Sequence, residues 1–458
     1  MAYSPGSRDT PHEKTGGTPM SPISSRLAAG ALVLGLVTAC GGDPAPQGAA
    51  QAASKELVYW SMWKQGEPQQ VALQAAIERF TKDTGIKVSV EWAGRDVVKQ
   101  KLPAALTTSK VPDVVDQSDD TIRPFMVTPG VARGLGKVYE ADVPGEPGKK
   151  VKDVIPAKYT QSPALKLASG EPYMVPYSVA GIGLFYDAAA LPEVAAAPPK
   201  DWASFTALLD RLKAGGAMAP ITADGEQYWS DSYWMNYYLY RTIGADGLKA
   251  VAEDRTGEAW RKPEVLAAAQ QIEKFARQGY LLKGYDASKY PEQQKNWAQN
   301  KAAFMIMGSW LPGEVGTYAK PGFKPASMPF PKVGGPAQGE EVVQFGFAMP
   351  TKAKNVEAGE RFIAHLTSKT FADDLARTAS VLSPREDAVV PEALAGLKKQ
   401  LDGVAATYPF AAGLSVPGWA DKVYYSTLGE LFNGKLSAQE FVDKIAGVQA
   451  EFWKNQGN

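Results

Sequence analysis

A strand–helix–strand pattern beginning near residue 57 constrains the fold more than any other feature of this 458-residue chain. Residues 57–60 form a short apolar run, and four apolar residues then follow at the spacing of one helix face: Leu73, Ala76, Ile77 and Phe80. Gly85 ends that helix, and alternating apolar residues indicate a second strand: Ile86, Val88, Val90 and Trp92. Two strands joined through a helix pair in parallel with a right-handed crossover. The first part of the chain is therefore predicted to be α/β with an open sheet.

Two extended segments stand apart from this regular pattern. The apolar run at residues 173–187 is crossed by Pro176 and is too long for one strand, so we expect two strands joined by an extended crossing. Residues 342–349 are also predicted to be extended. The glycines at 181 and 183 lack the third glycine and the following helix of a dinucleotide-binding site, so they indicate close backbone packing instead.

The remaining elements follow from the spacing of apolar residues. Helices are predicted near residues 98–106, 205–212, 265–276, 358–366 and 423–431, and buried strands at residues 114–115 and 302–307. Ser437 and Glu440 form a capping box that opens the last helix, which buries Phe441, Ile445, Val448 and Phe452. No internal repeat and no coiled-coil heptad is present.

Composition excludes several classes of function. The 49 basic and 49 acidic residues balance, so the chain offers no charged surface to nucleic acid or to an anionic membrane. Cys40, His12 and His365 are the only cysteine and histidines. They are too few for transition-metal sites, His-dependent catalytic triads or a disulfide framework, and we expect no metal and no cofactor. The 11 tryptophans and 19 tyrosines, by contrast, supply more rings than core packing requires.

Residues 26–40 (RLAAGALVLGLVTAC) carry the pattern of a secretory signal: a basic residue, about a dozen apolar or small residues, and a small-residue cleavage site. The run is shorter than the roughly 20 apolar residues that span a bilayer. Its last four residues resemble the bacterial lipobox, which makes Cys40 the lipidated N-terminus of the mature chain. A buried helix with an incidental cysteine is the alternative, but a Gly-, Pro- and Gln-rich tract follows at once. Residues 1–39 are thus a predicted signal peptide, with Met20 as an alternative start, and residues 40–54 a lipid anchor and flexible tether.

Six segments, in this order, resemble the extracellular carbohydrate-binding lipoproteins of ABC importers, the family that includes maltose-binding protein. They are FTKDTGIKV at 80–88, VPDVV at 111–115, PYMVPYSVAGIGLFYD at 172–187, PPKDWASF at 198–205, NKAAFMIMGSW at 300–310 and VLSPREDA at 381–388. The resemblance implies a two-lobed periplasmic-binding-protein-like fold, α/β in class, with a ligand cleft between lobes joined by hinge crossings. On that pattern the N-terminal lobe holds residues 55–177 and 345–385, and the C-terminal lobe holds residues 178–344 and 386–458.

A neutral sugar presents hydroxyls, which suit carboxylates, arginine and amides, and C–H faces, which suit aromatic rings. Trp63 follows the first predicted strand, at the sheet edge where open α/β sheets bind ligands, and is a better candidate than Trp60, which is placed to face the core. Asp119 and Asp120 follow the strand at residues 114–115 and could bind vicinal hydroxyls. The alternative role for these two acids is to cap the next helix.

The candidates in the second lobe are mainly aromatic. Trp234 and Tyr237 belong to a cluster of wide rings at residues 228–237 that exceeds the need of a core. Trp310 lies in the GSW context in which the resembled family places an aromatic ring at its sugar, and Trp419 lies where maltose-binding relatives carry another tryptophan. Arg385 resembles the family's LPSR loop and could donate to ring hydroxyls, the alternative being an ion pair with Glu386 alone.

The resemblance implies a lipid-anchored, extracytoplasmic, monomeric protein that binds a sugar or oligosaccharide, delivers it to ABC permease subunits and has no enzymatic activity. Residues 179–181 (VAG) stand where maltose binders have a glutamate, which puts maltose itself in doubt. The same fold could bind a polyamine, a peptide or a polyol phosphate. A lipid-anchored glycoside hydrolase would need two carboxylates about 5–10 Å apart, and nothing in the sequence singles out such a pair.

Overall fold

The computed structural model describes residues 55–225, 228–334, 340–409, 416 and 418–456. The predictions for the signal peptide, Cys40 and the tether lie outside the described residues.

The strand–helix–strand unit forms as predicted. The first strand, β1 (Glu56–Ser61), pairs in parallel with β2 (Lys87–Trp92) and β3 (Val114–Ser118). Helix α1 (Pro68–Thr84) connects β1 to β2, and Gly85 ends it with a φ of 70° in the left-handed region that suits glycine. Helix α2 (Arg95–Thr107) connects β2 to β3. Apolar residues from these helices cover both faces of the sheet, so this part of the chain has a buried parallel sheet.

Strand β4 (Val175–Asp187) is continuous where two strands were predicted. Its first part, Val175 to Gly181, pairs antiparallel with β8 (Glu340–Ala348). Its second part pairs antiparallel with β6 (Ala302–Gly308) and β7 (Pro325–Met328). The prediction of two strands was wrong because the register shift between Pro176 and Ser178 accommodates the proline inside one strand.

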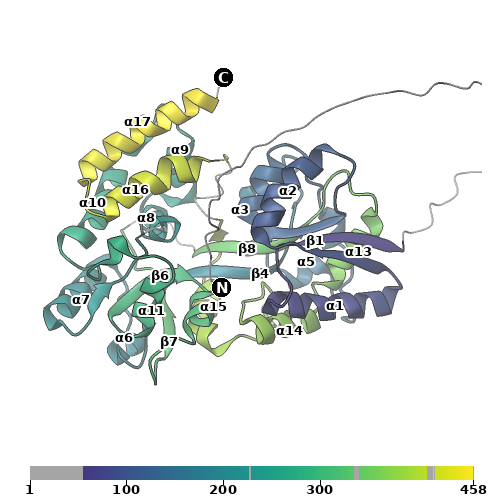
Figure 1. Cartoon of the computed structure of the whole chain (residues 1–458), viewed down its shortest axis with the longest axis horizontal. Helices are drawn as coiled ribbons and strands as arrows, with labels where there is room; N and C mark the ends of the chain where they lie inside the picture. The colour runs from purple at the N-terminus through teal and green to yellow at the C-terminus, as the bar shows by residue number, and fades with distance from the viewer. Residues whose placement is uncertain (1–54, 226–227, 335–339, 410–415, 417, 457–458) are drawn as a thin grey trace, which may run out of the picture. The chain divides into compact units, whose positions relative to one another are not determined.

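Strands β4 and β8 therefore connect two halves of one sheet, with the order β2-β1-β3-β8-β4-β6-β5, where β5 is Ala219–Ile221. They run side by side between the half that contains β1, α1 and α2 and the half that contains α7 (Trp202–Gly215) and α8 (Tyr228–Thr242), as Figure 1 shows. The predicted lobe boundaries at residues 177/178 and 344/345 fall within these two strands and stay a prediction.

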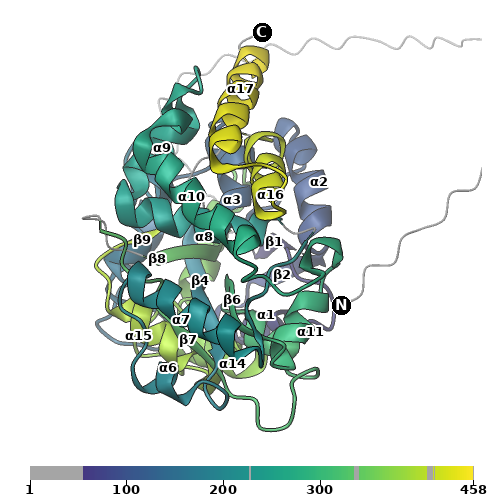
Figure 2. The same cartoon turned by 90° about the vertical axis from the view of Figure 1, so that its left-hand side faces the viewer.

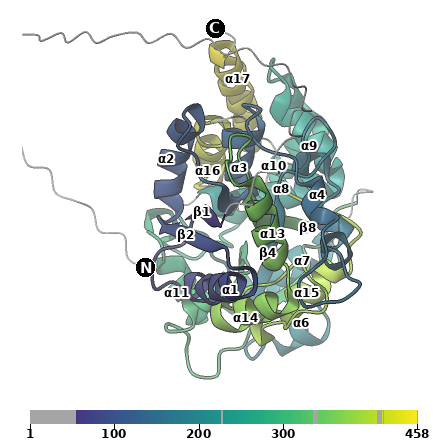
Figure 3. The same ribbon diagram turned by 90° about the vertical axis from the view of Figure 1, so that its right-hand side faces the viewer.

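A third segment passes between the two halves after α14 (Lys369–Ala379). Helix α14 packs against α1, and the two lie side by side in Figure 3. Leu382 then accepts a hydrogen bond from the backbone N–H of Val179 on β4, and α15 (Ala395–Asp402) packs under β4 and β7. The prediction of close backbone packing at Gly181 is confirmed, because a Cβ there would come within 3.0 Å of Leu401.

Helices enclose the other half of the sheet. Helix α8 packs against α10 (Pro263–Arg277) and α16 (Ser426–Phe432), as Figure 2 shows, and α17 (Ala438–Gln456) covers α10. The predicted capping box forms: the Ser437 N–H donates to Glu440 Oε2 at 2.7 Å, and the Glu440 N–H donates to Ser437 Oγ at 3.2 Å. Of the four residues predicted to be buried by α17, Val448 is only partly buried, while Gln449 one position on is fully buried.

The shorter elements are α3 (Asp119–Ile122), α4 (Gly136–Tyr139), α5 (Val151–Val154), α6 (Pro192–Ala196), α9 (Gly244–Glu253), α11 (Glu292–Ala298), α12 (Leu311–Val315), α13 (Val356–His365) and β9 (Thr407–Tyr408).

Candidate functional site

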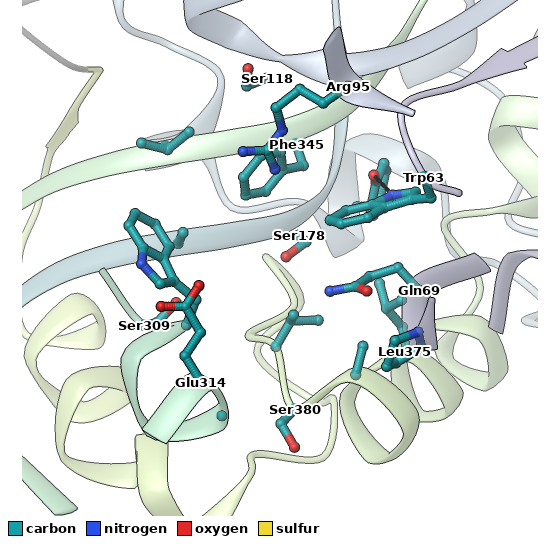
Figure 4. Close-up of a pocket in the computed structure, with 18 of the residues that line it drawn as sticks. Trp63, Gln69, Arg95, Ser118, Ser178, Ser309, Glu314, Phe345, Leu375 and Ser380 are labelled. Atoms are coloured by element: carbon teal, nitrogen blue, oxygen red, sulfur yellow. Dashed lines mark hydrogen bonds between the residues drawn. The ribbon is translucent and has the colours of Figure 1, made fainter. Parts of the chain in front are cut away.

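A pocket of about 810 Å³ opens where the two halves of the sheet meet. Its walls come from the loops after β1 and β3, from the starts of α1 and α2, from the crossing strands β4 and β8, and from α8, α11, α12 and the end of α14. Figure 4 shows side chains from these elements around a common space, with Trp63, Arg95 and Phe345 on one side and Ser309 and Glu314 on the other. A volume of this size lies within the usual range for a small-molecule site.

Trp63 and Phe345 form the aromatic wall on the side of β1, with ring centroids 6.1 Å apart and planes inclined by 56°. The Trp63 Nε1–H donates to Tyr177 Oη at 2.8 Å, and Tyr177 in turn donates to Asp116 Oδ2 at 2.7 Å. The Arg95 guanidinium lies 5.5 Å from the centre of the Phe345 ring and 6.0 Å from that of Trp63. These contacts fix the indole plane at the wall of the pocket.

Asp116 holds this wall from beneath. It is fully buried, and its Oδ1 accepts the backbone N–H of Met62 at 2.9 Å, next to Trp63. Burial raises the pKa of the Asp116 carboxyl to about 6, against the lowering effect of the hydrogen bonds from Tyr177 and Met62. The loop after β1 is therefore tied to β3 and β4 by one buried carboxyl group.

The opposite wall carries Trp229 on α8 and Trp310 after β6, whose ring centroids are 6.1 Å apart at an angle of 47°. Tyr233 packs against Trp229 edge to face. Gly308 makes room for the indole of Trp310, because a Cβ on Gly308 would come within 2.1 Å of that ring. Two partly buried tryptophans thus line the pocket from this side.

The charges that line the pocket balance. Arg95 and Lys99, both on α2, are its basic residues, and Asp120 and Glu314 are its acidic ones. Serine hydroxyls from four different segments add further donors and acceptors: Ser118, Ser178, Ser309 and Ser380. Ser380 ends α14 with a φ of 52°, a left-handed conformation that is uncommon for a residue other than glycine and is often found at functional sites. The arrangement suits a neutral solute with polar groups on its edge and apolar faces.

Three residues predicted from the sequence lie at this pocket: Trp63, Asp120 and Trp310. Trp63 and Asp120 follow β1 and β3 at the carboxyl edge of the parallel strands, where we expected them. Trp60, the less favoured alternative, packs partly buried against the hydrophobic cluster beneath α2.

Asp119 and Arg385 do not line the pocket. Asp119 is buried, and its Oδ1 accepts the backbone N–H of Gln344 at 3.0 Å, because α3 turns the first acid of the pair inward and the second outward. Burial, with the charge of Asp120, raises the pKa of Asp119 to about 7. The Arg385 guanidinium is buried in ion pairs with Glu146 and Asp387, at 2.7 and 2.8 Å. The predicted contact with the ligand and the alternative ion pair with Glu386 were therefore both wrong.

Trp234, Tyr237 and Trp419 are core residues. Trp234 is fully buried between Phe205 and Phe275, so the expectation that it reaches the cleft is corrected. Tyr237 donates its hydroxyl to the backbone oxygen of Ile182 at 2.9 Å, which ties α8 to β4. Trp419 is also buried and donates to Gln449 Oε1 at 3.1 Å. Helix α8 is enclosed on nearly all sides, so its many rings fill a core after all.

Several residues of the pocket were not predicted from the sequence: Arg95, Lys99, Tyr177, Trp229, Gln294, Glu314, Phe345 and Ser380. Three of them lie in segments that the sequence marks as unusual. Trp229 belongs to the aromatic cluster from which Trp234 and Tyr237 were chosen instead, Tyr177 lies in the proline-containing crossing, and Phe345 lies in the second extended segment. The others come from elements whose orientation toward the pocket depends on tertiary packing.

Comparison with known proteins identifies the family. Residues 64–372 match the family described as bacterial extracellular solute-binding protein, which is more than half of the chain. The chain belongs to this family. Its members are binding proteins with an extracytoplasmic location, and the two-lobed α/β fold is the one that we predicted.

Solved structures of solute receptors share this fold. The bacterial solute receptor AcbH, described as preferring β-D-galactopyranose exclusively, has a TM-score of 0.72 and 16% identity, covering 87% of this chain and 98% of AcbH. RafE from Streptococcus pneumoniae has a TM-score of 0.70 and 15% identity, covering 89% and 100%. A chitin oligosaccharide binding protein has a TM-score of 0.69 and 16% identity, covering 88% and 99%.

In the described part of the chain, no helix combines the length and the apolar composition that a membrane span requires. Among the same residues, no group of three or more histidine, cysteine, aspartate or glutamate side chains is arranged to hold a metal ion.

Proposed function

We propose that this family member is a lipid-anchored binding protein that captures a sugar or oligosaccharide outside the cytoplasm and delivers it to an ABC importer. The observation that carries the proposal is the pocket with an aromatic wall on each side and balanced charge between them. Trp63 and Phe345 offer apolar surface from one side, and Trp229 and Trp310 offer it from the other. Sugar rings have apolar C–H faces and hydroxyl edges, which match these walls and the serine and carboxylate groups between them.

The structure also supports a mode of capture. Within the described residues, the chain passes between the halves that carry the two walls along β4, β8 and the segment around Leu382. Small rotations about such crossings let binding proteins close on their solutes. A sugar between Trp63 and Trp310 would contact both halves and so stabilise the closed form.

Charge balance disfavours a polyamine and a polyol phosphate. A polyamine would require a strongly acidic pocket, whereas Arg95 and Lys99 line this one. A sugar or polyol phosphate would require a basic pocket, whereas Asp120 and Glu314 are present. The family consists of binding proteins, so we propose that the protein has no hydrolase activity.

The lipid anchor completes the proposal. The VTAC sequence that ends at Cys40 supports lipidation, and residues 41–54 would tether the binding domain to the membrane. The importer's permease subunits are the expected protein partners, and we propose that the binding protein itself is a monomer that needs neither metal nor cofactor.

A thermal-shift screen with calorimetric follow-up tests this function. The probes are galactose, raffinose, stachyose and N-acetylglucosamine oligomers, with putrescine, glycerol 3-phosphate and a tripeptide as alternative solutes. A ligand that binds only the folded state adds about 2.7 kcal/mol of stability at 100 times its dissociation constant, so sugar hits should be plain. A shift with putrescine, phosphate or peptide and none with sugars would contradict the proposal. Cleavage of a bound oligosaccharide, detected by chromatography, would favour a hydrolase.

A further inference from the structure

Tyr290 is an aromatic residue of the pocket that belongs to neither of the two aromatic walls. Four large apolar or aromatic side chains are exposed in the described part of the chain: Val58, Val71, Tyr290 and Tyr318. Of these four, Tyr290 alone lines the pocket, with 39% of its surface exposed. The other rings that line the pocket are partly or fully buried. Tyr290 is therefore the ring at the rim, where the pocket opens to solvent.

The backbone on both sides of Tyr290 is held in place. Two residues earlier, the buried Ser288 accepts the Gly225 N–H on its Oγ at 3.3 Å. On the other side, the backbone oxygen of Pro291 accepts the Lys295 N–H at 3.1 Å, which joins this segment to the first turn of α11. A ring on a fixed segment meets a solute without the entropic cost of ordering a loop. Exposure of Tyr290 thus leaves its ring available to a ligand.

One sugar unit does not use all of the rings. A pyranose ring has two broad faces, so a unit between the walls can place one face on Trp63 and Phe345 and the other on Trp229 and Trp310. Tyr290 comes from a separate segment, just before α11, and is more exposed than these four residues. A second unit, linked to the first and lying farther out, would meet the Tyr290 ring.

The size of the pocket agrees with more than one unit. Its volume of about 810 Å³ lies in the upper part of the range of about 300–1,000 Å³ that is usual for small-molecule sites. Stacking on Tyr290 requires no charge on the sugar, so it is consistent with the balanced charges that line the pocket.

We propose that Tyr290 forms an outer sugar subsite, which makes oligosaccharides rather than monosaccharides the substrate class of this protein. The inner unit lies between the two aromatic walls, and the Tyr290 ring stacks on the apolar face of a later unit. This inference rests on the proposed function, because it decides between a single sugar and an oligosaccharide at the same site.

Three length series of neutral sugars test the outer subsite by calorimetric titration. They are glucose, maltose and maltotriose; galactose, melibiose and raffinose; and N-acetylglucosamine with its dimer and trimer. In a series that binds, the affinity of the wild-type chain should rise by about tenfold or more from the monosaccharide to the trisaccharide. Tyr290→Ala should weaken binding of the trisaccharide by about three- to tenfold and change that of the monosaccharide by less than about twofold.

Tyr318→Ala is the matched control. Tyr318 is 40% exposed and lies beside α11, where Lys295 Nζ is 4.5 Å from the centre of its ring, but it does not line the pocket. This variant should bind every member of the series as the wild type does. Tyr290→Phe keeps the ring and should retain the preference for longer sugars. Melting temperatures should stay close to that of the wild type in all three variants, because both tyrosines are exposed.

Several results would overturn the outer subsite while the proposed function stands. They are an affinity that does not rise with length in the wild type, an equal loss for monosaccharide and trisaccharide in Tyr290→Ala, no loss in that variant, and the same loss in Tyr318→Ala. Failure of all three series to bind would instead count against the proposed function and this inference together.

Discussion

Replacing Trp310 with alanine tests both the site and the architecture, because the structure gives this residue a role that distinguishes it from other tryptophans. Its indole is only partly buried, lies over Gly308 and meets Trp229 at 6.1 Å. If a sugar ring stacks on it, Trp310→Ala removes an extended apolar contact from the centre of the pocket. Aromatic truncations at such positions commonly cost 2 kcal/mol of binding or more, which is roughly a thirtyfold loss of affinity.

Trp234→Ala is the matched control, since the sequence suggested both residues as ligand contacts and the structure places Trp234 in the core. A fully buried tryptophan replaced by alanine leaves a cavity that costs about 3–5 kcal/mol of stability. With an unfolding entropy of about 2.1 cal/mol/K per residue over roughly 400 residues, this loss lowers the melting temperature by roughly 4–6 °C. Trp310→Ala should lower it by less, because its ring keeps solvent contact.

A third variant moves the ring without removing it. Gly308→Ala places a Cβ within 2.1 Å of the Trp310 indole, against a ring that must then shift. We expect the affinity for sugar to fall while the apolar surface of Trp310 is still present. Comparing Gly308→Ala with Trp310→Ala distinguishes the effect of the indole's position on sugar affinity from the effect of losing the indole.

The assay is calorimetric titration of the tightest sugar probe, combined with thermal melting, on the wild type and all three variants. The expected pattern is a large affinity loss with a small melting change for Trp310→Ala, and the reverse for Trp234→Ala after correction for the folded fraction. A large melting drop with unchanged affinity in Trp310→Ala would refute its role as a stacking surface.

Three further outcomes are expected. Tyr177→Phe removes the hydroxyl between Trp63 and Asp116. Denaturant unfolding should show a loss of about 1–3 kcal/mol of stability, and calorimetric titration should show a weaker affinity for sugar. Unchanged stability and affinity would show that the hydroxyl is not needed. Burial raises the pKa of Asp119 to about 7, so between about pH 4 and 7 this carboxyl holds a proton in the folded chain but not in the unfolded chain. The free energy of unfolding should therefore fall as pH rises through that window, by up to about 1.4 kcal/mol per pH unit. Asp119→Asn should flatten this slope in denaturation curves at several pH values, and an unaltered slope would contradict the assignment. Cys40→Ser should abolish labelling by palmitate and leave sugar binding intact, and label that persists would contradict the lipobox.

Local sequence was sufficient where an element's pattern decides its own structure. The α1 face, Gly85 and the capping box at Ser437 were predicted because helix periodicity and capping depend on residues within one or two turns. Trp63 and Asp120 were found for a related reason: they directly follow strands, and the carboxyl ends of parallel strands lie at one edge of the sheet.

Local sequence failed where a ring's surroundings decide its role. Trp229 and Trp234 lie five positions apart on α8, yet one lines the pocket and the other is fully buried. An enclosed helix has no polar face to mark its orientation, so nothing in the local pattern separates the two. The ion pair between Arg385 and Glu146 could not be predicted for a different reason. Glu146 is distant in sequence, and only the folding of the first half brings it near Arg385.

The sequence by itself determined the fold class, the first strand–helix–strand unit, the family resemblance and the residues that follow the parallel strands. These properties depend on short-range periodicity and on the fixed handedness of strand–helix–strand connections. The tertiary structure alone decided that β4 is one strand shared by both halves of the sheet and which aromatic rings line the pocket. Each of these depends on contacts between segments distant in sequence, and the packing of whole elements, rather than any local propensity, sets which side chains meet.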